Sequence, residues 1–152
     1  MRESKYYKQM EKINFKHILP IQLRFNDIDQ FGHVNNSVYF SFYDLGKTNY
    51  FGSVCPNVDW NKDAIMVVHL EIDFIEQIYS TNRIAVQTAV TEIGNKSFQL
   101  YQEVIDQNTQ QVKCSCKSVM VTYDLENHCS KPLSEDWKEA ICSFEGKDVR
   151  RK

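Results

Sequence analysis

The sequence predicts an α+β domain in which one antiparallel sheet curls around a helix. Segments in which apolar and polar residues alternate with a period of two dominate the chain. Short connectors that resemble turns join several of these segments. One longer segment, 37–51, is apolar on most sides, which is typical of a buried helix. One sheet packed around one apolar helix satisfies this order of elements.

Five segments have the alternation expected of strands. The first is 19–25, which precedes the helix, and an irregular stretch separates the helix from the second, at 66–74. A meander of four strands is predicted from there on, at 66–74, 83–93, 97–105 and 111–123. The connectors 94–96 and 107–110 are short enough for tight turns, so the strands they join should be antiparallel neighbours.

Two helices complete the predicted domain. Gly46 inside the segment 37–51 costs about 1 kcal/mol relative to alanine, so we expect a neighbouring element to approach closely there. A last helix should begin at Ser134, an N-cap residue that two acidic residues follow in the first helical turn. Its apolar stripe, formed by Trp137, Ile141 and Phe144, can dock on the domain.

Length and charge exclude several classes of protein. A chain of 152 residues is the usual size of one domain, so 1–152 is treated as one domain. A net charge of −2 provides no field that would gather nucleic acid. The longest strictly apolar run is Ala64–Val68, far shorter than the ~18 residues of a membrane span.

The cysteines and histidines indicate neither disulfides nor a metal site. Five cysteines is an odd number, and Cys114 and Cys116 lack the spacing of a zinc or redox motif. The four histidines are dispersed. No apolar stretch at the start resembles a signal peptide, so we expect a cytoplasmic protein with reduced thiols.

The N-terminal segment carries four lysines at helical spacing. On a helix they would form one basic ridge, which is either an arm for an anionic partner or a solvated terminus; they are Lys5, Lys8, Lys12 and Lys16.

The loop 26–36 before the apolar helix concentrates polar chemistry. It contains Asp27, Asp29, Gly32, His33, Asn35 and Asn36. The first N–H groups of a helix have no partners inside it and could polarise a carbonyl oxygen. A carboxylate just upstream could then attack the carbonyl carbon or take a proton from water. The same residue types also form caps and turns, so an enzyme and a binding module both stay open at this point.

The run Asp27–Tyr39 resembles the signature D-x-D-x-x-G-H-V-N-N-x-x-Y of 4-hydroxybenzoyl-CoA-thioesterase-like hotdog proteins. The resemblance covers roughly 17–144. It implies the hotdog fold and hydrolysis of an acyl thioester, with the acyl group on coenzyme A or on acyl carrier protein. No cofactor is implied, because coenzyme A is part of the substrate.

The resemblance also implies roles for individual residues. Asp29 corresponds to the catalytic carboxylate, as nucleophile or general base, while Asp27 supports the loop. The amide near Asn36 would polarise the carbonyl, and His33 would orient groups around it. Candidate substrate-binding residues are Gly32, Asn35, Tyr39 and Ser97, and candidate contacts to coenzyme A phosphates are Arg83, Lys96 and Lys131.

Some residues depart from the family pattern. Asp44 and Lys47 stand where the helix often has glutamate and arginine, and Gln30 and His33 argue against the narrow benzoyl substrate. A hotdog dehydratase is disfavoured because its paired signature is missing. A non-catalytic module that binds acyl thioesters or a protein stays an alternative. Hotdog relatives form active sites between subunits, so we expect a homodimer or homotetramer.

Overall fold

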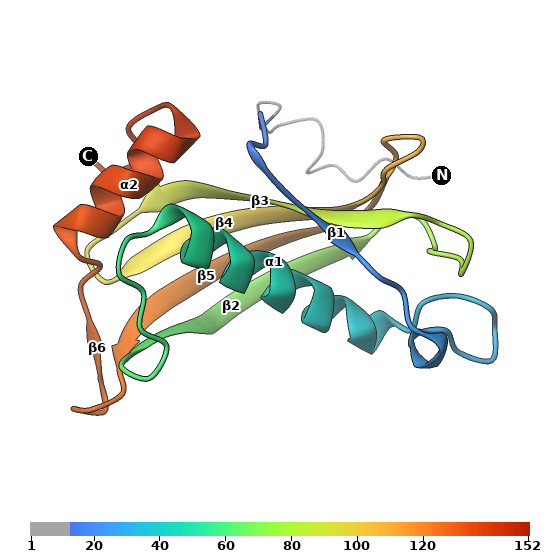
Figure 1. Ribbon diagram of the computed structural model, residues 1–152, viewed down its shortest axis with the longest axis horizontal. Helices are drawn as coiled ribbons and strands as arrows, with labels where there is room; N and C mark the ends of the chain where they lie inside the picture. Colours follow the sequence, from blue (N-terminus) through green and yellow to red (C-terminus); the bar gives the residue numbers. More distant parts are fainter. Residues whose placement is uncertain (1–12) are drawn as a thin grey trace.

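The computed structural model describes residues 13–152 and has the predicted α+β architecture. A curved antiparallel sheet lies behind the long helix α1 (Figure 1). The elements are β1 (His17–Ile21), α1 (Tyr39–Val54), β2 (Asp63–Phe74), β3 (Ile84–Ile93), β4 (Ser97–Asp106), β5 (Val112–Asp124), β6 (Cys129–Lys131) and α2 (Glu135–Glu145). Two short 3-10 turns, Phe25–Asp27 and Asn36–Val38, flank the loop before α1.

The order of the strands differs from a simple meander. The sheet runs β1-β3-β4-β5-β2, with the short β6 paired to the end of β5. Strands β3, β4 and β5 are neighbours joined by tight turns, as predicted. The predicted first strand of the meander, β2, instead lies at the far edge of the sheet beside β5. The connector 75–83 is too long for a tight turn, so β2 and β3 need not be neighbours.

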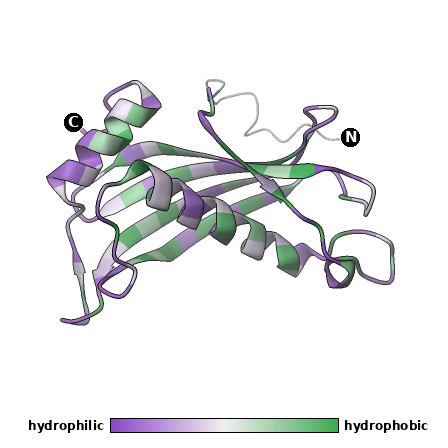
Figure 2. Ribbon diagram, viewed as in Figure 1, coloured by the Kyte–Doolittle hydropathy of each residue, from purple (hydrophilic) through white to green (hydrophobic). Residues whose placement is uncertain are grey.

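The core lies between α1 and the sheet, whose strands alternate between hydrophobic and hydrophilic residues (Figure 2). Tyr39, Phe42 and Tyr43 pack on one half of the sheet, and Tyr50 and Phe51 pack on the other half together with α2. The helix is not buried on every side within one chain. Two of its large apolar residues remain exposed, Phe40 (47%) and Leu45 (53%).

The first strand is shorter than predicted. It ends at Ile21, and Phe25 instead lies in a 3-10 turn with its side chain 95% exposed. The turn forms because the Asp27 carboxylate accepts the backbone N–H of Arg24 at 2.8 Å and bends the chain.

Three of the four lysines of the predicted basic ridge, Lys5, Lys8 and Lys12, lie outside the described residues. Only the fourth, Lys16, lies within them. That lysine directly precedes β1 and lies outside any helix, and its ammonium donates to the Glu145 carbonyl at the end of α2, at 2.8 Å. The C-terminal helix begins at the predicted cap, because the Ser134 hydroxyl accepts the N–H of Trp137. No helix within 13–152 is long and apolar enough to cross a membrane.

The two edges of the sheet differ in how they are protected from pairing with another strand. On the β1 side, Pro20 lies in the edge strand, and the C-terminal segment continues the sheet through Ile93 N–H to the Val149 carbonyl at 2.8 Å. On the other side, β2 is twelve residues long and exposes Met66, Val67 and Val68. Within the described chain no strand pairs with its outer edge. Natural proteins seldom leave such an edge uncovered.

Candidate active site

The loop before α1 folds into a tight hairpin that presents Asp29. The N–H of Asp29 donates to the His33 carbonyl at 2.9 Å, and the N–H of Gly32 donates back to the Asp29 carbonyl at 3.0 Å. Gly32 has φ +83°, a left-handed conformation that strains other residues. Gly32 therefore allows the chain to make the tight turn of the hairpin.

The Asp29 carboxylate is oriented by its own loop. Its Oδ1 atom accepts the backbone N–H of Phe31 at 2.9 Å, in the arrangement of an Asx turn. The residue is half-buried. Within 13–152 no hydrogen bond to its Oδ2 is found, so this oxygen can receive a proton or approach a carbon.

Asp27 braces the base of the hairpin. Its side chain is 1% exposed and accepts the Arg24 guanidinium at 3.0 Å together with the Arg24 backbone N–H. Its carbonyl accepts the N–H of Asn35 at 3.0 Å. Both ends of the hairpin are thereby tied together, which is the supporting role expected for Asp27.

The helix start follows directly after the hairpin. Asn35 is the N-cap, since its Oδ1 accepts the Ser37 N–H at 2.9 Å and the Ser37 hydroxyl at 2.7 Å. The turn Asn36–Val38 then leads into α1. As the first residue of this turn, Asn36 has a backbone N–H without an acceptor inside the helix. The carboxylate and this amide are thus presented by one continuous, internally bonded segment.

His33 is fixed by a segment that the sequence patterns did not single out. It forms a β-bridge with Tyr79, and its imidazole meets the Tyr79 ring edge-on with centroids 5.0 Å apart. The adjacent Ile78 is fully buried and accepts the Val34 N–H. In the sequence, this segment is marked only by the apolar pair Ile78–Tyr79 before a Ser-Thr-Asn turn. Two residues are too few to show the periodicity that identifies a strand.

The other predicted site residues divide into two groups. Tyr39 begins α1 beside the hairpin, 2% exposed, with its ring 5.2 Å from that of Phe74, and burial raises the pKa of its phenol. Ser97 opens β4 at the end opposite Asp106, about 30 Å along the strand. Asp106 is the end near the loop, because it accepts the amide of Asn82, whose Oδ1 in turn accepts the Tyr79 N–H. Within one chain the structure does not bring Ser97 to Asp29.

The charged residues that the sequence analysis singled out lie in different parts of the structure. Lys47 pairs with Asp44 on α1 at 3.2 Å. Lys96 lies exposed in the turn before β4, and Arg83 lies exposed before β3. Lys131 pairs with Asp63 at 2.5 Å. Within one chain Lys96 and Lys131 lie at the end of the sheet away from the Asp29 hairpin, whereas Arg83 directly follows Asn82 at the nearer end.

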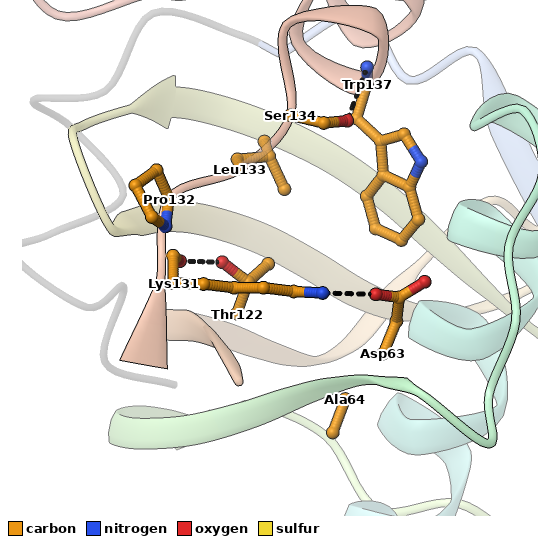
Figure 3. A pocket seen from close by; sticks show the side chains of 8 residues that line it. All are labelled: Asp63, Ala64, Thr122, Lys131, Pro132, Leu133, Ser134 and Trp137. Atoms are coloured by element: carbon orange, nitrogen blue, oxygen red, sulfur yellow. Dashed lines mark hydrogen bonds and ion pairs between the residues drawn. The ribbon is translucent and has the colours of Figure 1, made fainter. Parts of the chain in front are cut away.

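A cavity of about 200 Å³ lies at the start of β2, where Lys131 reaches over Thr122 to Asp63 (Figure 3). Its apolar wall comes from Leu133 and Trp137. Its remaining lining residues are Ala64, Pro132 and Ser134. It is remote from Asp29 in the same chain, because Phe74, at the other end of β2, is the residue that contacts Tyr39.

Known proteins share both the sequence pattern and the fold. Residues 23–141 match the family model described as the Thioesterase-like superfamily. The chain belongs to this superfamily. Its resemblance to the narrower 4-hydroxybenzoyl-CoA-thioesterase-like group stays a prediction.

Three relatives illustrate the range of similarity. A thioesterase from Thermus thermophilus, solved with coenzyme A and Zn, is 26% identical with a TM-score of 0.76, over 88% of this chain and 96% of that one. The uncharacterized protein YsmA of Bacillus subtilis is 21% identical over 86% of this chain and 88% of its own length. The chloroplastic acyl-acyl carrier protein thioesterase ATL2 of Arabidopsis thaliana is 30% identical over 51% of this chain and 43% of its own length. Membership in the superfamily supports hydrolysis of acyl thioesters as the general activity.

Proposed function

We propose that the protein hydrolyses acyl-CoA to a free acid and coenzyme A, with Asp29 as the working carboxylate. The observation that carries the proposal is the hairpin that joins Asp29 directly to the start of α1, with Oδ1 held by the Phe31 N–H and Oδ2 open. The part of the chain that matches the superfamily model, residues 23–141, includes this hairpin.

The chemistry follows from the two groups that the segment presents. The thioester carbonyl oxygen would accept the Asn36 N–H, which stabilises the negative charge that develops on attack. Asp29 either attacks the carbonyl carbon itself or takes a proton from the attacking water. The C–S bond then breaks, and the thiolate of coenzyme A takes a proton from water in the nucleophile route or from Asp29 in the general-base route. In the first case water hydrolyses the acyl-aspartate that forms.

His33, Gly32, Asn35 and Tyr39 have supporting roles in this proposal. Gly32 and Asn35 shape the hairpin and the helix start. His33, held against Tyr79, orients the groups around the carbonyl, and the buried Tyr39 packs against Phe74 and supports the start of α1. Ser97 lies at the far end of β4 from Asp29 in the same chain, so its role as a substrate-binding residue stays a prediction.

Replacing Asp29 with asparagine tests the proposal. Asp29→Asn should lower kcat/KM for release of free thiol from acyl-CoA by about 10²- to 10⁴-fold, the usual contribution of a general base. Asp44→Asn, an exposed carboxylate on α1, is the matched control and should retain activity. Circular dichroism and calorimetric binding of acyl-CoA should show that Asp29→Asn still folds and binds. No thiol release by the wild type across short, long and aromatic acyl groups would instead favour a binding module.

The proposed reaction needs no bound cofactor or metal, because a carboxylate and a helix amide suffice for it. Assays in EDTA test this point. We place the protein in the cytoplasm, and the five free cysteines, of which Cys55, Cys114 and Cys116 are buried, support a reducing compartment.

We further propose that the protein works as a homodimer that pairs through β2. The support is the long exposed edge of this strand, which a second copy would cover with a continuous sheet.

A further inference from the structure

The segment between β2 and β3 holds the hairpin that presents Asp29. The Ile78 carbonyl accepts the Val34 N–H at 2.9 Å, and Tyr79 forms a β-bridge with His33. The His33 carbonyl in turn accepts the N–H of Asp29 at 2.9 Å. The position of the proposed working carboxylate therefore depends on what fixes this segment.

A relay of hydrogen bonds ties Tyr79 to the end of β4. The backbone N–H of Tyr79 donates to Asn82 Oδ1 at 2.7 Å, and Asn82 Nδ2 donates to Asp106 Oδ2 at 3.0 Å. A backbone N–H can only donate, so the oxygen of the Asn82 amide must face Tyr79 and its nitrogen must face Asp106. Asp106 Oδ1 accepts the N–H of Asn108 at 2.8 Å, which connects the relay to the turn between β4 and β5.

Asp106 carries a buried charge that the turn alone does not require. Its side chain belongs to a residue that is 5% exposed, and no lysine or arginine of residues 13–152 forms an ion pair with it. Burial of a carboxylate is costly unless its oxygens accept hydrogen bonds. An asparagine has one acceptor oxygen, which would suffice for the Asn108 N–H. A carboxylate has two, so it also holds Asn82.

A second anchor fixes the other end of the same segment. Lys113, near the start of β5, is also 5% exposed, and its ammonium donates to the Gln77 carbonyl at 3.1 Å. The Lys113 carbonyl accepts two further backbone N–H groups of the segment, each at 3.0 Å. Both anchors belong to the pair β4–β5, and Ile78 and Tyr79 lie between them. The segment is thus held on both sides of the residues that contact the Asp29 hairpin.

We propose, on the basis of the proposed hydrolysis by Asp29, that Asp106 is a positioning residue that acts through Asn82 and Tyr79 on the Asp29 hairpin. A displacement of about 1 Å in a reacting group can cost about 100-fold in rate. Substrate binding is spread over many contacts and tolerates such a displacement better. Loss of the relay should therefore lower kcat more than it raises KM.

Asp106→Asn tests the relay with almost no change in the shape of the side chain. A single amide oxygen cannot accept both the Asn108 N–H and the Asn82 amide, so one of these two links opens. We expect kcat for thiol release from acyl-CoA to fall at least about tenfold, while KM changes less than about threefold. Circular dichroism should show a folded protein at the assay temperature. A wild-type kcat in this variant would overturn the proposal.

Exchange of the two side chains, Asn82→Asp together with Asp106→Asn, should rescue activity. The carboxylate at position 82 then accepts the Tyr79 N–H and the amide of position 106, whose oxygen still accepts the Asn108 N–H. Every hydrogen bond of the relay is restored, one of them in the reverse direction, and the net charge is unchanged. We expect kcat within about threefold of the wild type. Asn82→Asp alone places two carboxylates against each other and should also lower kcat. A folded double variant without recovery would overturn the proposal.

Asp124 provides a matched control at the opposite end of the sheet. It ends β5, its Oδ2 accepts Asn127 Nδ2 at 2.8 Å, and its Oδ1 accepts the Glu126 N–H at 2.9 Å. Asp124→Asn therefore disturbs the same kinds of hydrogen bond, but Asp124 pairs with Asp63, at the end of β2 remote from the hairpin. Its kcat should stay within about twofold of the wild type. Equal losses of kcat in Asp106→Asn and Asp124→Asn would overturn the proposal.

Hydrogen exchange tests the relay independently of activity. The N–H groups of Asp29 and Val34, both bonded in the folded hairpin, should exchange faster in Asp106→Asn and return to the wild-type rate in the double variant. Unchanged exchange in Asp106→Asn would overturn the proposal even if the wild type hydrolyses acyl-CoA. A wild type that releases no thiol would end the proposed hydrolysis, and the exchange rates alone would then decide whether Asp106 positions the hairpin.

Discussion

Gly46 marks the closest approach between α1 and the sheet. A Cβ atom built there would lie 2.7 Å from the Val86 side chain and 3.0 Å from those of Thr88 and Gln102. The Gln102 amide occupies this space because it donates both to the Tyr43 carbonyl in α1 and to the Thr88 hydroxyl, each at 3.0 Å. The close approach expected from the sequence is therefore found: side chains of β3 and β4 lie against Gly46, and the one on β4, Gln102, binds the helix backbone.

Gly46→Ala should therefore destabilise the protein, although alanine favours helices. Overpacking of this kind costs about 1–3 kcal/mol, more than the roughly 1 kcal/mol gained in helix propensity. Gly52 lies in the same helix with open space around its Cβ position, so Gly52→Ala should stabilise by about 0.5–1 kcal/mol. Urea unfolding of the two variants measures the difference. A stabilised Gly46→Ala would show that the sheet yields easily at this point.

The helix α2 is attached to the rest of the molecule through a buried carboxylate. Glu145 is 7% exposed, and its Oε1 accepts the Tyr50 hydroxyl at 2.6 Å and the Val90 N–H at 3.1 Å. That N–H lies on β3 between the part covered by β1 and the part covered by the C-terminal segment. A side chain thus replaces a missing strand at this position, and burial together with the Glu145 carboxylate raises the pKa of Tyr50.

Glu145→Ala should weaken the attachment of α2 to the sheet more than an alanine substitution at an exposed position of the same helix would. It leaves the Tyr50 hydroxyl and the Val90 N–H without an acceptor in a dry site, a cost of about 1–3 kcal/mol for each unsatisfied group. Hydrogen exchange should then accelerate over α2 and at Val90. Glu139→Ala, on the exposed side of the same helix, is the control and should leave exchange near that of the wild type. Equal acceleration in both variants would show that the carboxylate does not attach the helix.

How far the sequence predicts this molecule depends on where the determining contacts lie. Alternation within each segment located β2 to β5, and the signature located the hairpin, because both are local patterns. The end of β1 was misplaced because Leu23 and Phe25 continue the alternation while the Asp27 side chain turns the chain. The edge position of β2 and the distance of Ser97 from Asp29 depend on pairing between distant segments. No pattern within one segment contains that information.

Over the whole molecule, buried thiols should make the fold sensitive to alkaline pH. Burial raises the pKa of Cys55, Cys114 and Cys116 from 9.0 to about 12. Below pH 9 these thiols are protonated in both states and do not affect stability. Above pH 9 the unfolded chain loses these protons while the folded protein keeps them, so the free energy of unfolding falls as the pH rises toward 12.

Urea unfolding at pH 8, 9 and 10 measures this loss. The free energy of unfolding should fall by up to roughly 1 kcal/mol per buried thiol for each pH unit above 9. Cys116→Ala removes one buried thiol, so its stability should fall less steeply with pH than that of the wild type. Cys129 is exposed, and Cys129→Ala is therefore the matched control that should keep the wild-type slope. The tyrosines add to the loss only above their ordinary value of 10.0, which leaves the interval from pH 9 to 10 to the thiols. The same slope in both cysteine variants would assign the alkaline sensitivity to other groups.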